Sequence, residues 1–141
     1  MFGLELSPST LLLDAIAIAA ALIYLPFLVV AYGRLQMGYD MSAPRAMFDK
    51  LPPFAQRATW AHQNSFETFI VFAAAAITAY ITGQDSPLVA GSAIAFVVAR
   101  LFYSIFYILD VPLLRSLMFA VGSTSTAILF VLSLLSVNPF S

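Results

Sequence analysis

Long apolar stretches alternate with short polar connections along this chain of 141 residues. Four stretches, residues 10–32, 58–82, 87–109 and 113–136, are long enough for helices that cross a membrane, which takes about 20 apolar residues. A turn at residues 83–87 separates the second stretch from the third, and Asp110 precedes Pro112 as an N-cap before a first-turn proline. The pattern therefore predicts an all-α integral membrane protein, a four-transmembrane-helix bundle in a single domain (1–141).

The composition agrees with this class and excludes several kinds of chemistry. Charged residues make up 9% of the chain, against about 25% in a typical soluble domain. A net charge of −1 offers no basic field for nucleic acid. Without cysteine, and with His62 as the one histidine, we expect no disulfide, no cysteine nucleophile and no metal cluster. His62 itself is interpreted either as a ligand or base or, preferably, as a polar surface group.

The cations lie on one side of the predicted spans. The connection 33–57, expected to be an irregular loop, holds four of the six Lys and Arg residues. These are Arg34, Arg45, Lys50 and Arg57. Because cationic loops stay in the cytoplasm, we expect this loop to be cytoplasmic and both termini to be non-cytoplasmic.

Two predicted helices carry polar side chains along one face. Asn64 and Glu67 share a face of the second span, and Arg100, Tyr103 and Tyr107 share a face of the third. Ionisable groups inside a membrane face a protein interior or a watery cavity and are candidates for function. We expect Glu67 to pair with Arg100, since a buried unpaired charge is costly. The pair would either lock the helices together or belong to a site, and the spacing leaves both open.

Arg115 stands at the start of the fourth span, where the helix dipole disfavours a cation. Such an arginine indicates a nearby anion, namely a carboxylate, a phosphate or a thiolate. Ser116 beside it adds a hydroxyl donor. The alternative is an arginine that reaches to a lipid phosphate at the membrane surface.

Two motifs in these segments resemble a known family. They read Arg57-Ala-x-x-Ala-His62-x-Asn64-x-x-Glu67-Thr-Phe and Arg100-x-x-Tyr103-x-x-x-Tyr107-x-x-Asp110-x-Pro112-x-x-Arg115-Ser116. Both are similar to the signatures of the MAPEG family, the membrane-associated proteins in eicosanoid and glutathione metabolism, closest to its bacterial branch. The resemblance implies a homotrimer in the bacterial inner membrane, with glutathione bound between adjacent subunits near the cytoplasmic side.

The resemblance also implies a role for each matching residue. Asn64, Glu67, Arg100, Tyr103 and Tyr107 would bind glutathione, with Glu67 taking its amino group. Arg115 would stabilise the thiolate, and Ser116 would donate a hydrogen bond to the same sulfur. The implied activity is that of a membrane glutathione transferase or peroxidase, without a metal, acting on hydrophobic electrophiles or lipid hydroperoxides.

Departures from the family pattern leave a second interpretation open. Gln63 stands where several members carry an arginine that holds glutathione, so the predicted pocket has fewer cations. The alternative is a non-catalytic small membrane subunit or lipid-binding scaffold that packs on a larger membrane complex. A transporter using Glu67 is disfavoured, because no pair of broken helices is predicted. No motif identifies the hydrophobic second substrate.

Overall fold

The structure, a computed structural model, describes residues 6–138 and 140, and every regular element among them is helical. The elements are α1 (Pro8–Gln36), the 3-10 helix η1 (Pro44–Lys50), α2 (Pro53–Ile81), α3 (Pro87–Ile108) and α4 (Pro112–Val137). The four α-helices are long and apolar enough to span a membrane, which confirms the four predicted spans.

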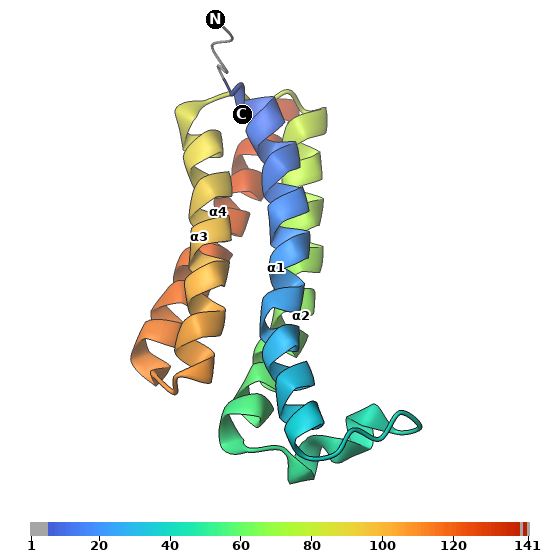
Figure 1. Cartoon of the computed structure of the whole chain (residues 1–141). Coiled ribbons are helices and arrows are strands. Elements are labelled where there is room, and N and C mark those ends of the chain that lie inside the picture. Colours follow the sequence, from blue (N-terminus) through green and yellow to red (C-terminus); the bar gives the residue numbers. More distant parts are fainter. Residues whose placement is uncertain (1–5, 139, 141) are drawn as a thin grey trace, which may run out of the picture.

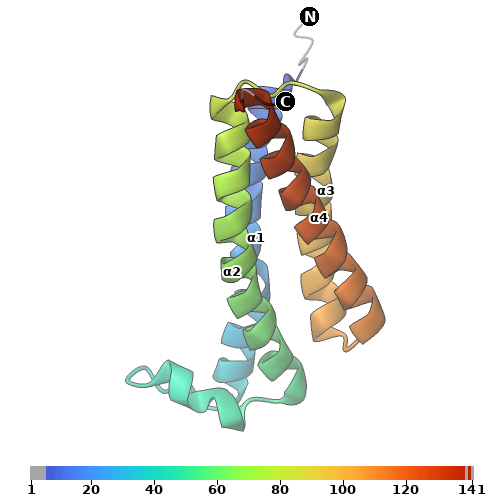
Figure 2. The same cartoon turned by 180° about the vertical axis from the view of Figure 1, so that it is seen from behind.

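The four α-helices run up and down in an antiparallel bundle (Figure 1). The α2–α3 turn lies at the same end as the start of α1 and the end of α4, whereas η1 and the α3–α4 turn lie at the other end, here called the η1 end. The closest neighbours are α1 with α2 and α3 with α4. Helices α1 and α2 reach beyond the α3–α4 turn, and the two pairs diverge toward the η1 end (Figure 2).

The connection between α1 and α2 is more ordered than the irregular loop expected for residues 33–57. Helix α1 continues to Gln36, and α2 already begins at Pro53. Between them η1 forms because Met47 and Leu51 are buried against the bundle. Gly33 allows the helices to come close there, since a Cβ at this residue would lie 2.6 Å from the Cβ of Ala55.

Asp110 is not the N-cap residue of α4 that the sequence predicted. This residue has a φ of 59° and belongs to the end of α3: its N–H donates to the Tyr107 carbonyl at 3.2 Å, and the Val111 N–H donates to the Phe106 carbonyl at 2.9 Å. This pair of bonds is the Schellman arrangement, which needs a left-handed residue at this position. Val111 is therefore the N-cap residue of α4, and its side chain makes no capping bond.

The larger of two buried apolar clusters occupies the half of the bundle away from η1, and a smaller one joins α1, η1 and the start of α2. The rings of Phe72 on α2 and Phe96 on α3 stack with centroids 3.7 Å apart. Alanines dominate the rest of this cluster, so the helices approach closely there. Toward the η1 end from this stack, the polar residues of α2, α3 and α4 face one another.

Candidate functional site

Arg100 is the most deeply placed charge of the site. It lies on α3 and is 5% exposed. Its Nη2 donates hydrogen bonds to Asn64 Oδ1 at 3.0 Å and to Ser65 Oγ at 3.3 Å, both on α2. The guanidinium also lies 4.0 Å from the centre of the Tyr103 ring. The cation is thus held by neutral oxygens and an aromatic face.

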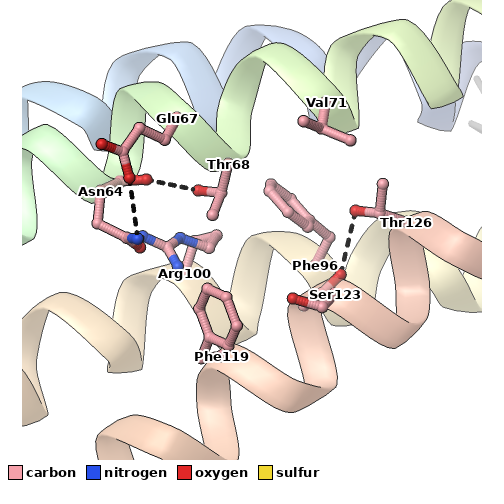
Figure 3. A pocket seen from close by; sticks show the side chains of 10 residues that line it. Asn64, Glu67, Thr68, Val71, Phe96, Arg100, Phe119, Ser123 and Thr126 are labelled. Carbon is pink, nitrogen blue, oxygen red and sulfur yellow. Dashed lines mark hydrogen bonds between the residues drawn. The ribbon is translucent and has the colours of Figure 1, made fainter.

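The predicted ion pair between Glu67 and Arg100 is not formed among the described residues. Asn64 lies between them instead: its oxygen accepts from Arg100, and its Nδ2 donates to Glu67 Oε2 at 3.4 Å (Figure 3). Glu67 is exposed and also accepts a long bond from Gln63 at 3.5 Å. The Glu67 carboxylate is therefore exposed, and the Asn64 amide bridges it to the buried Arg100 guanidinium by one hydrogen bond to each.

Arg115 joins the cluster from α4. Its guanidinium lies 4.6 Å from the centre of the Tyr107 ring. Its main-chain N–H makes the first hydrogen bond of the helix, to the Val111 carbonyl at 3.0 Å, so the residue stands in the first turn as the sequence predicts. Tyr107 in turn contacts Tyr103 edge-on, with ring centroids 5.6 Å apart. Two arginines from two helices are thus connected through two tyrosine rings.

Every predicted site residue borders one of three adjoining cavities. The first, about 280 Å³, is lined by Asn64, Tyr103, Tyr107, Arg115, Ser116 and Phe119. The second, about 420 Å³ and wide open, is lined by Trp60, Gln63, Asn64, Glu67 and Tyr107. The third, here called the apolar cavity, measures about 300 Å³ and is lined by Asn64, Glu67, Thr68, Val71, Phe96, Arg100, Phe119, Gly122, Ser123 and Thr126. Asn64 borders all three cavities.

Several lining residues were not predicted. Trp60 shares a helical face with Asn64, and that spacing was sufficient to include it. Phe119 follows Arg115 by four residues and faces the same cavity. Ser65, which accepts a bond from Arg100, lies beside Asn64 but carries no distinguishing signal in the sequence.

His62 is not the polar surface group that the sequence favoured. Its Nδ1 lies 2.7 Å from the Ile23 carbonyl of α1, and it donates this bond because a carbonyl can only accept. The ring is half-buried between the aromatic rings of Tyr24, Phe27 and Phe66. His62 therefore ties α2 to α1, on a face of α2 different from that of Asn64.

A fourth cavity, of about 620 Å³, lies between α1, η1 and α2. Arg34 and Arg45 line it together with aromatic side chains that include Phe48 and Trp60. The Nε of Arg34 is buried and has no hydrogen-bond partner. This cavity shares Trp60 and Gln63 with the second cavity but no lining residue with the cavity that contains Arg115.

Comparison with known proteins supports the family resemblance of the two motifs. The sequence model of the MAPEG family matches residues 11–135, which include all four α-helices almost to their ends and every residue of the site. No curated protein matches the chain. Because the family model covers most of the sequence, this integral membrane protein belongs to the MAPEG family.

Proposed function

We propose that this chain is a membrane glutathione transferase or peroxidase that activates the glutathione thiol against hydrophobic electrophiles or lipid hydroperoxides. The observation that carries the proposal is the position of Arg115. It is a first-turn arginine that stacks on Tyr107 and borders the same cavity as Asn64 and Ser116. Family membership supports glutathione as the ligand.

Glutathione has two carboxylates, one ammonium group and one thiol, and the cluster offers a partner for each kind of group. The open carboxylate of Glu67 suits the ammonium group. Arg100, Asn64 and Tyr107 offer donors for a carboxylate and for the peptide backbone. Tyr103 closes the cavity behind Tyr107 through its edge-on contact.

Arg115 and Ser116 then act on the sulfur. A cysteine thiol has a pKa of about 8.5 in water, and a nearby arginine and a helix N-terminus lower that pKa. The bound thiol would ionise near neutral pH, and the thiolate would be the attacking nucleophile. With an electrophile, a carbon–sulfur bond forms as a leaving group departs with its electron pair or an epoxide ring opens. With a lipid hydroperoxide, the thiolate takes the terminal OH to become a sulfenic acid as the O–O bond breaks. The lipid alkoxide then takes up the proton that the thiol lost and leaves as an alcohol, and a second glutathione reduces the sulfenic acid to give the disulfide and water.

The test is the ultraviolet absorbance of the thiolate when purified protein is mixed with millimolar glutathione. We expect a clear thiolate signal from the wild type, loss of most of it in Arg115→Ala, and partial retention in Arg115→Lys, which keeps the charge. Lys50→Ala, an exposed cation of η1 outside the cavities, is the matched control and should leave the signal unchanged. Absence of a signal from the wild type would exclude thiol activation and favour the non-catalytic lipid-binding alternative.

We also propose that the working unit is a homotrimer in which an adjacent subunit completes each glutathione site. Arg34 supports this, because its buried Nε has no partner within the described chain and its cavity shares no lining residue with the cavity of Arg115. The measurement is the mass of the protein–detergent complex by light scattering, where a monomer would refute the trimer. If the trimer forms, Arg34→Ala should weaken glutathione binding without changing the mass.

The η1 end is proposed to face the cytoplasm, with both termini on the opposite side of the inner membrane. The cations Arg34, Arg45, Lys50 and Arg57 support this orientation. Because the chain has no cysteine, one introduced cysteine reports the side directly. In sealed cells, the cysteine of a Ser42→Cys variant should not react with a thiol reagent that cannot cross the membrane. Labelling of this cysteine in intact cells would show that the η1 end faces outward and would refute the proposed orientation.

A further inference from the structure

Arg57 begins the first of the two family motifs but borders none of the four cavities described above. It lies in the second turn of α2, and its Nε donates a hydrogen bond to the Ile108 carbonyl, the last of α3, at 3.0 Å. The last four carbonyls of a helix need donors from outside it. Main-chain N–H groups of the α3–α4 turn donate to those of residues 105–107, and Arg57 donates to the fourth. The bond thus completes the end of α3 and fastens it to the base of α2.

Long-range side-chain hydrogen bonds join the α3–α4 pair to the rest of the described chain at three levels. Gln84 bonds to Ser136 at the end away from η1, and Arg100 bonds to α2 in the middle of the bundle. The third is the bond of Arg57 at the η1 end, the end toward which the two helix pairs diverge (Figure 2). Arg57 therefore joins the pairs where they are otherwise furthest apart.

Two further contacts hold the same turn of α3. The Ile108 side chain packs against the smaller apolar cluster at the η1 end. The Trp60 ring, about one turn after Arg57 on α2, has its centroid 6.4 Å from that of the Tyr107 ring. These contacts place Ile108 and Tyr107 against α2, and the hydrogen bond from Arg57 adds a directional main-chain contact to them.

The residue that Arg57 holds is closely connected to Arg115. Beyond Ile108 the chain makes the Schellman bonds around Asp110 and enters α4, whose first hydrogen bond is made by the Arg115 N–H. The Arg115 guanidinium also lies 4.6 Å from the ring centre of Tyr107, the neighbour of Ile108. A shift of Ile108 away from α2 would therefore carry Arg115 away from α2 as well.

We propose, resting on the proposed function, that Arg57 is a positioning residue for thiol activation. It contacts neither glutathione nor its sulfur. Through the Ile108 carbonyl it sets the distance between the Arg115 guanidinium on α4 and the glutathione groups held by Asn64 and Glu67 on α2. The hydrogen bond has this effect, and the positive charge of Arg57 is not required for it.

Three variants of Arg57 separate the hydrogen bond from the charge. Arg57→Met keeps a long apolar side chain without a donor. Arg57→Gln loses the charge but carries its amide nitrogen on Cδ, where arginine carries Nε, so it can donate to the same carbonyl. Arg57→Asn is one methylene too short to do so and is the milder second variant if Arg57→Met does not fold. Gln56→Leu is the matched control, because it removes a bond of 3.2 Å to the Phe48 carbonyl that ties α2 to η1 instead of α3.

The first readout is the distance between spin labels at the starts of α2 and α4, measured without glutathione by double electron–electron resonance. The chain has no cysteine, so Pro53→Cys and Leu113→Cys provide the two exposed label sites. Dilution with unlabelled protein removes distances between subunits. We expect a longer and broader distance in Arg57→Met, and the wild-type distance in Arg57→Gln and Gln56→Leu.

The second readout is the pH midpoint of thiolate absorbance with bound glutathione. Arg57→Met should raise this midpoint by about one pH unit, the effect of moving one charge from about 4 Å to about 6 Å from the sulfur at an effective dielectric constant of about 20. Arg57→Gln and Gln56→Leu should keep the wild-type midpoint. Glutathione affinity should fall by less than the fraction of thiolate, because Asn64 and Glu67 remain in place on α2.

The outcomes separate this proposal from the proposed function. An unchanged label distance in Arg57→Met, or an equal change in Gln56→Leu, would show that Arg57 does not hold the turn. A longer distance with an unchanged midpoint would refute the positioning role, and an equal rise in Arg57→Met and Arg57→Gln would assign the effect to the lost charge. Each of these results leaves thiol activation by the wild type standing. Absence of a thiolate signal from the wild type would overturn the proposed function, while the label distance would still decide whether Arg57 holds the turn.

Discussion

Replacing Asn64 by leucine should destabilise the fold, because it removes the closer of the two oxygens that accept from Arg100 Nη2. A hydrogen bond to a charged group contributes about 1.5–3 kcal/mol in proteins. Hydrogen bonds between membrane helices average about 0.6 kcal/mol, because the unfolded chain in the membrane also finds partners. Arg100 is 5% exposed, so water cannot easily replace the lost oxygen. We therefore expect a loss of about 2 kcal/mol in the free energy of unfolding.

Replacing Arg100 itself by methionine should lower the free energy of unfolding by less than Asn64→Leu does. Removing one partner leaves a buried charge unsatisfied, whereas an apolar side chain of similar length removes the charge together with its desolvation cost. The lost contact with the Tyr103 ring offsets part of that gain. We expect a change within about 1 kcal/mol. Adding Asn64→Leu to Arg100→Met should then cost almost nothing more, since the two residues form one interaction.

The assay is equilibrium unfolding in mixed micelles with a rising fraction of denaturing detergent, followed by helical circular dichroism. The four proteins of the cycle are the wild type, the two single variants and the double variant. If Arg100→Met loses as much stability as Asn64→Leu, or if the two losses simply add, then Asn64 does not hold the buried charge and the reasoning is refuted.

Two further substitutions test the close approach and the turn at the η1 end, each by the thermal midpoint of the helical signal. Gly33→Ala would bring a Cβ to 2.6 Å from the Cβ of Ala55 and should lower the free energy of unfolding by about 1–3 kcal/mol. Gly91→Ala, whose new Cβ would have nothing within 4 Å, is the control and should be neutral or slightly stabilising. Equal responses of the two variants would contradict the close approach. Asp110→Gly should raise the thermal midpoint, because a φ of 59° costs a residue with a Cβ about 1–2 kcal/mol, whereas glycine adopts it without that steric cost. A lowered midpoint would show instead that the aspartate side chain stabilises the turn.

The spans and the membership of the polar cluster could be predicted because each depends on a strong periodic signal. A membrane requires about 20 consecutive apolar residues, so the four helices were evident from hydropathy. The helical repeat placed Asn64 and Glu67 on one face and Arg100 and Tyr107 on another, and the structure brings these faces together.

The partners within the cluster could not be predicted, because spacing fixes the face of a helix but not the reach of each side chain. Glu67 is exposed, while Asn64, one turn nearer the η1 end, accepts the bond from Arg100. The interaction of His62 depends on how closely α1 packs against α2, which no local pattern records. The 3-10 helix η1 likewise depends on the burial of Met47 rather than on local propensity.

The unequal lengths of the helices determine where the site lies relative to water and lipid. Helix α2 has 29 residues and α3 has 22, so at 1.5 Å per residue they are about 43 Å and 33 Å long. The longer helix matches a whole bilayer with its headgroups, about 40–45 Å, and the shorter one matches little more than the hydrocarbon core, about 30 Å. Trp60, near the start of α2, and Tyr107, near the end of α3, therefore lie at the headgroup boundary, while the apolar cavity extends below it. Under the proposed function, glutathione from the water side and an apolar substrate from the lipid side would meet near Asn64.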